Sequence, residues 1–134
     1  MTTKSVGHVT FDYDQKLNIV FIEPHWEVHT REDVDAFFAE YVRFFGALSK
    51  PAYMVVNIDH LRVHADIAGY YGELARSKVI QHLLGYARYG DDALARMLIR
   101  TSSSRAGIAA NIHDSREQAL AAVEVMKQNQ RGKV

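Results

Sequence analysis

A chain of 134 residues is long enough to bury one hydrophobic core, and its 16 basic and 16 acidic residues leave no net charge. This balance argues against the global positive field that would attract nucleic acid or an anionic membrane surface. Because cysteine is absent, disulfides, thiolate zinc sites and cysteine nucleophiles are excluded together. The start MTTKSVGH has no apolar run typical of a signal peptide, and no segment has the roughly 20 apolar residues that cross a bilayer. We expect a single cytoplasmic domain over residues 1–134.

The first part of the sequence predicts a β-hairpin followed by a helix. Apolar residues alternate with polar ones along 8–23, on either side of a polar turn at 14–16, and a loop is expected after Pro24. Thr30 and Asp33 then match a capping box, although Asp33 is shorter than the usual Glu. Beyond this cap, apolar residues recur at helical spacing at Val34, Phe37, Phe38, Tyr41, Phe45 and Leu48.

The middle of the sequence alternates between strand and helix patterns. Residues 52–58 are apolar almost throughout and partly β-branched, which predicts a strand covered on both faces. Residues 65–88 have helical periodicity, but one helix of this length would span roughly 36 Å. That is longer than a strand layer of about 20 Å, so we expect a break near Ser77 or an overhang. Residues 96–101 read as a second buried strand.

The last third predicts a short irregular region and a final helix. Residues 102–114 are small and polar, with a possible helical turn and a possible short strand at 111–112, and Asp114 with Glu117 forms a second match to a capping box. The tail 128–134 has no core residues and is expected to fray. The order β-β-α-β-α-β-α predicts an α/β fold with helices packed on a mixed sheet, parallel at its centre with an antiparallel hairpin at its edge.

This order of elements, together with 54-MVVNIDHL-61 and 112-IHDSREQALAAV-123, resembles the STAS domain superfamily, and within it the small single-domain SpoIIAA-like bacterial proteins. The resemblance implies a non-enzymatic regulatory module that binds protein partners and needs no cofactor. In antagonist members, the loop after the central strand carries an Asp and then a Ser or Thr that a kinase phosphorylates. Asp59 fits that Asp, but residues 59–76 contain no Ser or Thr, so the phosphorylation switch is expected to be missing.

Four of the seven histidines form two His-x-x-x-His pairs, His25 with His29 and His60 with His64. On a helix this spacing suits zinc. Neither pair lies securely in a predicted helix, however, and neither has the Glu that follows the first His in zinc proteases. We therefore interpret these residues as solvated loop histidines and assign no metal site.

The carboxyl ends of parallel strands share one edge of a sheet, where open α/β folds tend to bind ligands. That edge is expected to gather a set of partner-binding or ligand-binding residues: His25, Trp26, His29, Asp59, His60, Arg62 and His64. Trp26, the only tryptophan, either anchors a partner or caps the core.

Four tyrosines at 70, 71, 86 and 89 predict either a homodimer surface or core packing. No spacing typical of a catalytic motif is present, so we assign no catalytic residue. The sequence leaves two interpretations of function. One is a protein-interaction module that binds a partner or itself, and the other is a domain that binds a small lipid-like, anionic or metal ligand.

Overall fold

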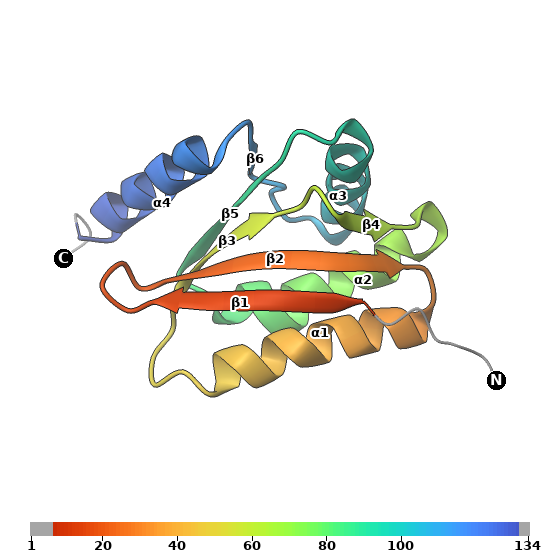
Figure 1. The fold of residues 1–134 in the computed structure, drawn as a ribbon, viewed down its shortest axis with the longest axis horizontal. Helices are drawn as coiled ribbons and strands as arrows, with labels where there is room; N and C mark the ends of the chain where they lie inside the picture. Colours follow the sequence, from red (N-terminus) through yellow and green to blue (C-terminus); the bar gives the residue numbers. More distant parts are fainter. Residues whose placement is uncertain (1–6, 132–134) are drawn as a thin grey trace.

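The computed structural model describes residues 7–131, which form one six-stranded mixed sheet with helices on both faces (Figure 1). The strands lie in the order β1-β2-β3-β5-β6, and the short β4 pairs with β2. β1 and β2 are antiparallel, whereas the other neighbours are parallel. This confirms the predicted parallel centre and antiparallel hairpin edge. The strands are β1 (His8–Asp14), β2 (Ile19–Val28), β3 (Tyr53–Asn57), β4 (Leu61–Val63), β5 (Gly85–Tyr89) and β6 (Ile112–His113).

The helices divide the core into two parts. The larger cluster packs one face of the sheet against α1, α2 and α3, and the smaller cluster packs the opposite face against Ala119 and Val123 of α4. Figure 1 shows α1 and α4 on opposite sides of the strands. The helices are α1 (Arg31–Gly46), α2 (Ala68–Leu74), α3 (Ala93–Ala106) and α4 (Arg116–Arg131), with shorter turns η1 (Ala65–Ile67), η2 (Ala75–Val79) and η3 (Ile80–His82).

The predicted hairpin and first helix are confirmed by their local contacts. In the hairpin turn, the Asp14 carboxylate accepts a hydrogen bond from the Leu17 N–H at 3.0 Å. At the start of α1, the Thr30 hydroxyl accepts from the Asp33 N–H and the Asp33 carboxylate accepts from the Thr30 N–H, each at 3.1 Å. Asp33 is therefore long enough to complete the capping box. The buried face of α1 is formed by Val34, Phe37, Phe38 and Tyr41.

The predicted strand at 96–101 is wrong, because these residues lie inside α3. The Asp92 carboxylate caps the helix by accepting from the Ala95 N–H at 2.8 Å, and Gly107 ends it with a φ of 71°. The left-handed conformation of Gly107 is one that glycine adopts without steric cost. The buried residues of α3 recur at helical spacing: Ala95, Leu98, Ile99, Ser102 and Ser103. Two of them are serines, which the sequence pattern assigned to a loop.

The predicted helix over 65–88 is correct only in its first part. The regular α-helix α2 ends at Leu74, and Ser77 lies in the π-helical turn η2, but the chain stays helical past Ser77 as far as His82. After His82 the chain enters β5 instead of continuing as a helix. Tyr71 and Tyr86 are buried in the larger core cluster, so core packing accounts for these two tyrosines.

β2 also departs from the prediction, since it continues through Pro24 to Val28 instead of ending in a loop. The Trp26 N–H donates to the His60 carbonyl on the β4 side of the strand. Backbone N–H groups two residues apart on a strand point to the same side, so the nitrogen of Pro24 points to the same side of β2 as the Trp26 N–H. On that side β2 pairs with β3 as far as Ile22 and with β4 from Trp26 onward, so Pro24 lies opposite the gap between these two strands. No ladder hydrogen bond is lost there, and the proline is compatible with an inner strand.

The C-terminal elements are shifted slightly from their predicted positions. β6 begins at Ile112, one residue later than expected. The Ser115 hydroxyl, and not Asp114, accepts from the Gln118 N–H at the start of α4, at 3.1 Å. The helix continues to Arg131, through most of the tail that was expected to fray, and residues 132–134 of that tail lie outside the described residues.

Two tyrosines beneath the sheet predict a loss of stability at alkaline pH. Burial raises the pKa of Tyr71 to about 12 and that of Tyr41 well above 10.0, although the Arg88 guanidinium works in the opposite direction. In the unfolded chain both hydroxyls ionise near pH 10. The unfolded state therefore releases protons that the folded state keeps, and stability should fall as pH rises from about 10 to 12.

Denaturant unfolding at a series of alkaline pH values measures this effect, and Tyr71→Phe should make the decline shallower. The absorbance of tyrosinate provides the second readout. If all seven tyrosines ionise together near pH 10 while the protein remains folded, the burial of these two hydroxyls is contradicted.

Candidate functional site

Two neighbouring parallel strands bring the histidines of the two sequence pairs together crosswise. β2 pairs with β4, and the histidines of each pair are four residues apart. This shared spacing puts His25 beside His60, with stacked rings whose centroids are 4.5 Å apart. It also puts His29 beside His64, at 4.1 Å. The close pairs therefore form between strands, not along a helix.

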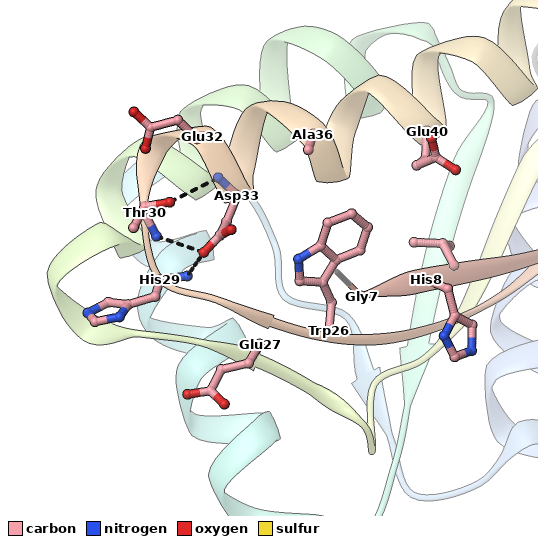
Figure 2. Close-up of a pocket in the computed structure, with 11 residues that line it drawn as sticks. Gly7, His8, Trp26, Glu27, His29, Thr30, Glu32, Asp33, Ala36 and Glu40 are labelled. Carbon is pink, nitrogen blue, oxygen red and sulfur yellow. Dashed lines mark hydrogen bonds between the residues drawn. The ribbon is translucent and has the colours of Figure 1, made fainter. Parts of the chain in front are cut away.

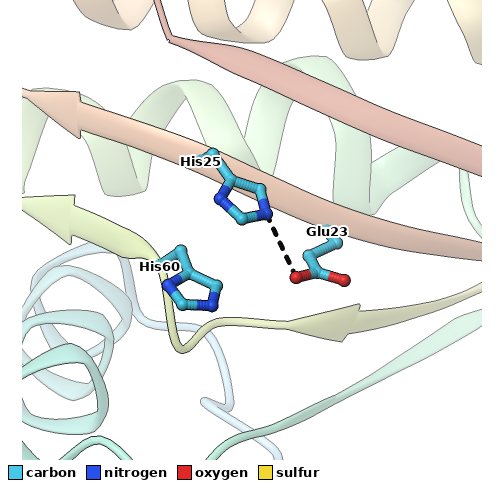
Figure 3. Close-up of side chains that lie close together, drawn as sticks. All are labelled: Glu23, His25 and His60. Atoms are coloured by element: carbon cyan, nitrogen blue, oxygen red, sulfur yellow. Dashed lines mark hydrogen bonds and ion pairs between the residues drawn. The ribbon is translucent and has the colours of Figure 1, made fainter.

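The first cluster contains a third imidazole and a carboxylate. His8 of β1 stacks on His25 with ring centroids 4.8 Å apart, so the His25 ring lies between its neighbours from β1 and β4. Its Nε2 is 3.1 Å from Oε2 of Glu23. Figure 3 shows the Glu23 carboxylate and the rings of His25 and His60 on the same side of the strands. The side chains of His25 and Glu23 are 39% and 43% exposed, so solvent reaches both.

The second cluster lies one step further along the same strands. Oε2 of Glu27 is 2.7 Å from Nε2 of His64, which is half-buried. Nε2 of His29 is 3.7 Å from a carboxylate oxygen of Asp66, a longer contact between more exposed groups. In each of the two clusters, one ligand atom from each of three residues lies within 4.8 Å of the others: Glu23, His25 and His60, and His29, His64 and Asp66.

Glu27 was missed because a loop was predicted after Pro24, and Glu23 was missed because the predicted strand ended before His25. In the strand, residues 22, 24, 26 and 28 are buried, whereas 23, 25, 27 and 29 face outward as Glu, His, Glu and His. This alternation was available in the sequence as a period of two. The outward residues share the sheet face that α4 covers near Ile19, and α4 does not extend over them.

Asp59 and Arg62 are engaged in contacts within the fold. The Asp59 carboxylate accepts from the backbone N–H groups of Asp91 and Asp92 at 2.7 and 2.9 Å. Arg62 donates to the Asp59 carbonyl at 3.1 Å and to the Asp92 carboxylate at 2.9 Å. The Ala95 N–H and then the Arg62 charge lower the pKa of Asp92. These contacts fix the loop after β3 against the start of α3, so both residues support the shape of this edge.

Trp26 lies in a groove between β2 and α1 (Figure 2). Its side chain is 7% exposed and packs edge-on against Phe37, with ring centroids 5.5 Å apart. Among residues 7–131, no partner accepts a hydrogen bond from its buried Nε1–H. The groove has a volume of about 840 Å³ and is bordered by the carboxylates of Glu27, Glu32, Asp33 and Glu40. Trp26 thus forms part of the core and also borders an open groove.

The structure therefore assigns the seven predicted site residues to three environments. The four histidines form two exposed or half-exposed cross-strand pairs. Asp59 and Arg62 belong to an internal polar network, and Trp26 lies on the opposite face of β2. Within the described part of the chain, no helix is both long and apolar enough to span a membrane.

Comparisons with known proteins identify the fold but assign no role to the histidine clusters. No family model and no curated protein matches the sequence. A solved structure of the anti-sigma factor antagonist SpoIIAA in its unphosphorylated form matches with a TM-score of 0.53 and 13% identity. The match covers 87% of this chain and 96% of that chain. The order of helices and strands and the mixed sheet agree with this match, and the chain has a STAS-like fold.

Proposed function

We propose that the protein is a non-enzymatic, cytoplasmic interaction module that binds a protein partner, or a second copy of itself, without a phosphorylation switch. The observation that carries this proposal is the state of the loop after β3. Residues 59–76 contain no Ser or Thr, and the Asp59 carboxylate is already bound by two backbone N–H groups. The STAS-like fold supports a binding role, because the antagonist proteins that share it act through protein partners.

The proposed contact surface is the outward face of β2 and β4. It presents the imidazoles of His25, His29, His60 and His64, with Asp59 and Arg62 holding the loop beneath them. This surface combines flat aromatic rings with carboxylates, so it offers both apolar contact area and charge to a partner. On the other face of β2, the groove beside Trp26 extends the contact region.

Quantitative affinity capture tests the proposal by comparing two equivalent substitutions. His60→Glu changes an exposed ring on the proposed surface, whereas His82→Glu makes the same change at an exposed position outside it. We expect His60→Glu to reduce the captured partner, or the dimer fraction in sedimentation, by about tenfold, and His82→Glu to leave both unchanged. Equal capture by both variants would contradict the surface. Phosphate found on residues 59–76 after incubation with kinases would contradict the missing switch.

Turnover of a small substrate that is lost in His60→Ala would contradict the non-enzymatic assignment. Asp59 is unsuitable for this test, because its carboxylate holds the backbone of two other residues. A substitution there would change the loop itself. His60 is exposed, and its ring can be removed with little change to the core.

A second proposal is the binding of a small ligand in the groove between β2 and α1. Its volume of about 840 Å³ falls in the range of roughly 300 to 1,000 Å³ that is typical of ligand sites. The Trp26 Nε1–H is buried beside this groove, so it would donate to a carbonyl or hydroxyl oxygen only of a ligand that displaces the groups covering it. Native mass spectrometry of the purified protein should then show a retained small molecule that is lost in Trp26→Phe. A spectrum of the bare chain alone would leave the interaction module as the only proposal.

A further inference from the structure

The first histidine cluster has a donor set that binds metal ions. Glu23 and His25 are two residues apart on β2, so both side chains project from the same face of the strand. His60 immediately precedes β4 and reaches the same position from the neighbouring strand. One ligand atom from each of these three residues lies within 4.8 Å of the other two (Figure 3).

Imidazole nitrogen and carboxylate oxygen suit zinc and the neighbouring divalent transition metals. Metal–ligand bonds of about 2.0 to 2.2 Å with tetrahedral angles place donor atoms roughly 3.3 to 3.6 Å apart. Nε2 of His25 is already 3.1 Å from Oε2 of Glu23, and the three donor atoms all lie within 4.8 Å of one another, so only a small adjustment is needed. His60 is exposed, so its ring can turn out of the stack toward Glu23 without disturbing the core. Three protein ligands leave a fourth position for water or for a donor from another molecule.

We propose that Glu23, His25 and His60 form a binding site for one divalent transition-metal ion of the zinc class. The strand pairing fixes the backbone positions of the three ligands before the ion arrives. His8 packs against the His25 ring on the β1 side and limits its motion. Because imidazoles on two strands coordinate the same ion, its binding links β4 to β2 by side chains as well as by backbone hydrogen bonds.

The second cluster provides an internal comparison. His64 is already paired with Glu27 at 2.7 Å, and the Asp66 side chain, in the short turn η1, is 73% exposed. Coordination there would require separating the existing contact between His64 and Glu27 and ordering an exposed carboxylate. We therefore expect His29, His64 and Asp66 to bind the ion more weakly than the first cluster.

Zinc titration of the full chain by calorimetry tests the proposal. We expect one ion to bind tightly per chain in the absence of chelators. His25→Ala and Glu23→Gln should each weaken this binding by about tenfold or more, and His25→Ala combined with His60→Ala should abolish it. The matched double variant, His29→Ala with His64→Ala, should keep the tight binding within about twofold of wild type. Circular dichroism verifies that each variant is folded.

Nuclear magnetic resonance gives a second readout, which is the position of the ion. Substoichiometric Ni²⁺, which is paramagnetic, should broaden the ring resonances of His25 and His60 before those of His29 and His64. The proposal is overturned if wild-type protein takes up no zinc, or if tight binding survives in the variant that lacks His25 and His60. Earlier broadening of His29 and His64 would place the ion in the other cluster, which also overturns it.

Discussion

Replacing Phe38 by alanine should lower the free energy of unfolding by about 3 to 5 kcal/mol. Phe38 is 4% exposed and lies in the larger core cluster. Its ring centroid is 5.1 Å from that of Phe37 and 4.9 Å from that of Tyr71, so it joins α1 to α2. Truncation removes a large buried apolar area and leaves a cavity between rings that cannot collapse freely. A loss of this size is a large share of the stability of a small domain.

Denaturant unfolding of Phe38→Ala and Val42→Ala measures the effect against a control on the same helix. Val42 is 47% exposed, so its truncation should change stability by no more than about 0.5 kcal/mol. A loss below about 1 kcal/mol for Phe38→Ala would show that the inward face of α1 has been assigned to the wrong residues.

The elements predicted correctly are those whose pattern is local and repeated. The buried residues of α1 recur over about two turns after a capping box, so helical periodicity and the start signal agree. By contrast, 96–101 contains only a short apolar run at 97–99, which fits a buried strand as well as a helix. What distinguishes the helix is the burial of Ser102 and Ser103, and small polar residues give no sign of this burial in the sequence.

β5 was missed for a related reason. Its residues continue the apolar spacing of the helix before them, and Gly85 and Ala87 have no strong strand preference. They form a strand because β3 and β6 lie on either side, so the assignment depends on pairing between residues far apart in sequence. Tertiary context of this kind outweighs local propensity.

The candidate site was predicted as a set of residues but not as an arrangement. The sequence placed the four histidines at the carboxyl edge of the sheet, where they lie. Their partners depend on the register between β2 and β4, which no local pattern specifies. The crosswise pairing of His25 with His60, and the presence of Glu23 beside them, follow only once both strands are in place.

The packing of α2 on α3 predicts opposite effects for two glycines on one helix. A Cβ built on Gly72 would lie 2.2 Å from the Ser102 carbonyl oxygen and 3.0 Å from the Cβ of Ala106. The Ser102 oxygen belongs to the backbone of α3, so the helices must move apart to admit a methyl group. We expect Gly72→Ala to lower the free energy of unfolding by about 1 to 3 kcal/mol.

Gly69 is the matched control, because its added Cβ would meet only the Arg105 Cδ, at 3.9 Å, an ordinary contact distance. Alanine restricts the unfolded chain and favours the helix, so Gly69→Ala should raise stability by about 0.4 to 1 kcal/mol. Thermal and denaturant unfolding of both variants measure the difference. If the two substitutions have effects of the same sign and size, α2 and α3 do not approach as closely as the contact at Gly72 requires. That result would also remove the reason for small side chains at Ser102 and Ala106, which lie opposite Gly72.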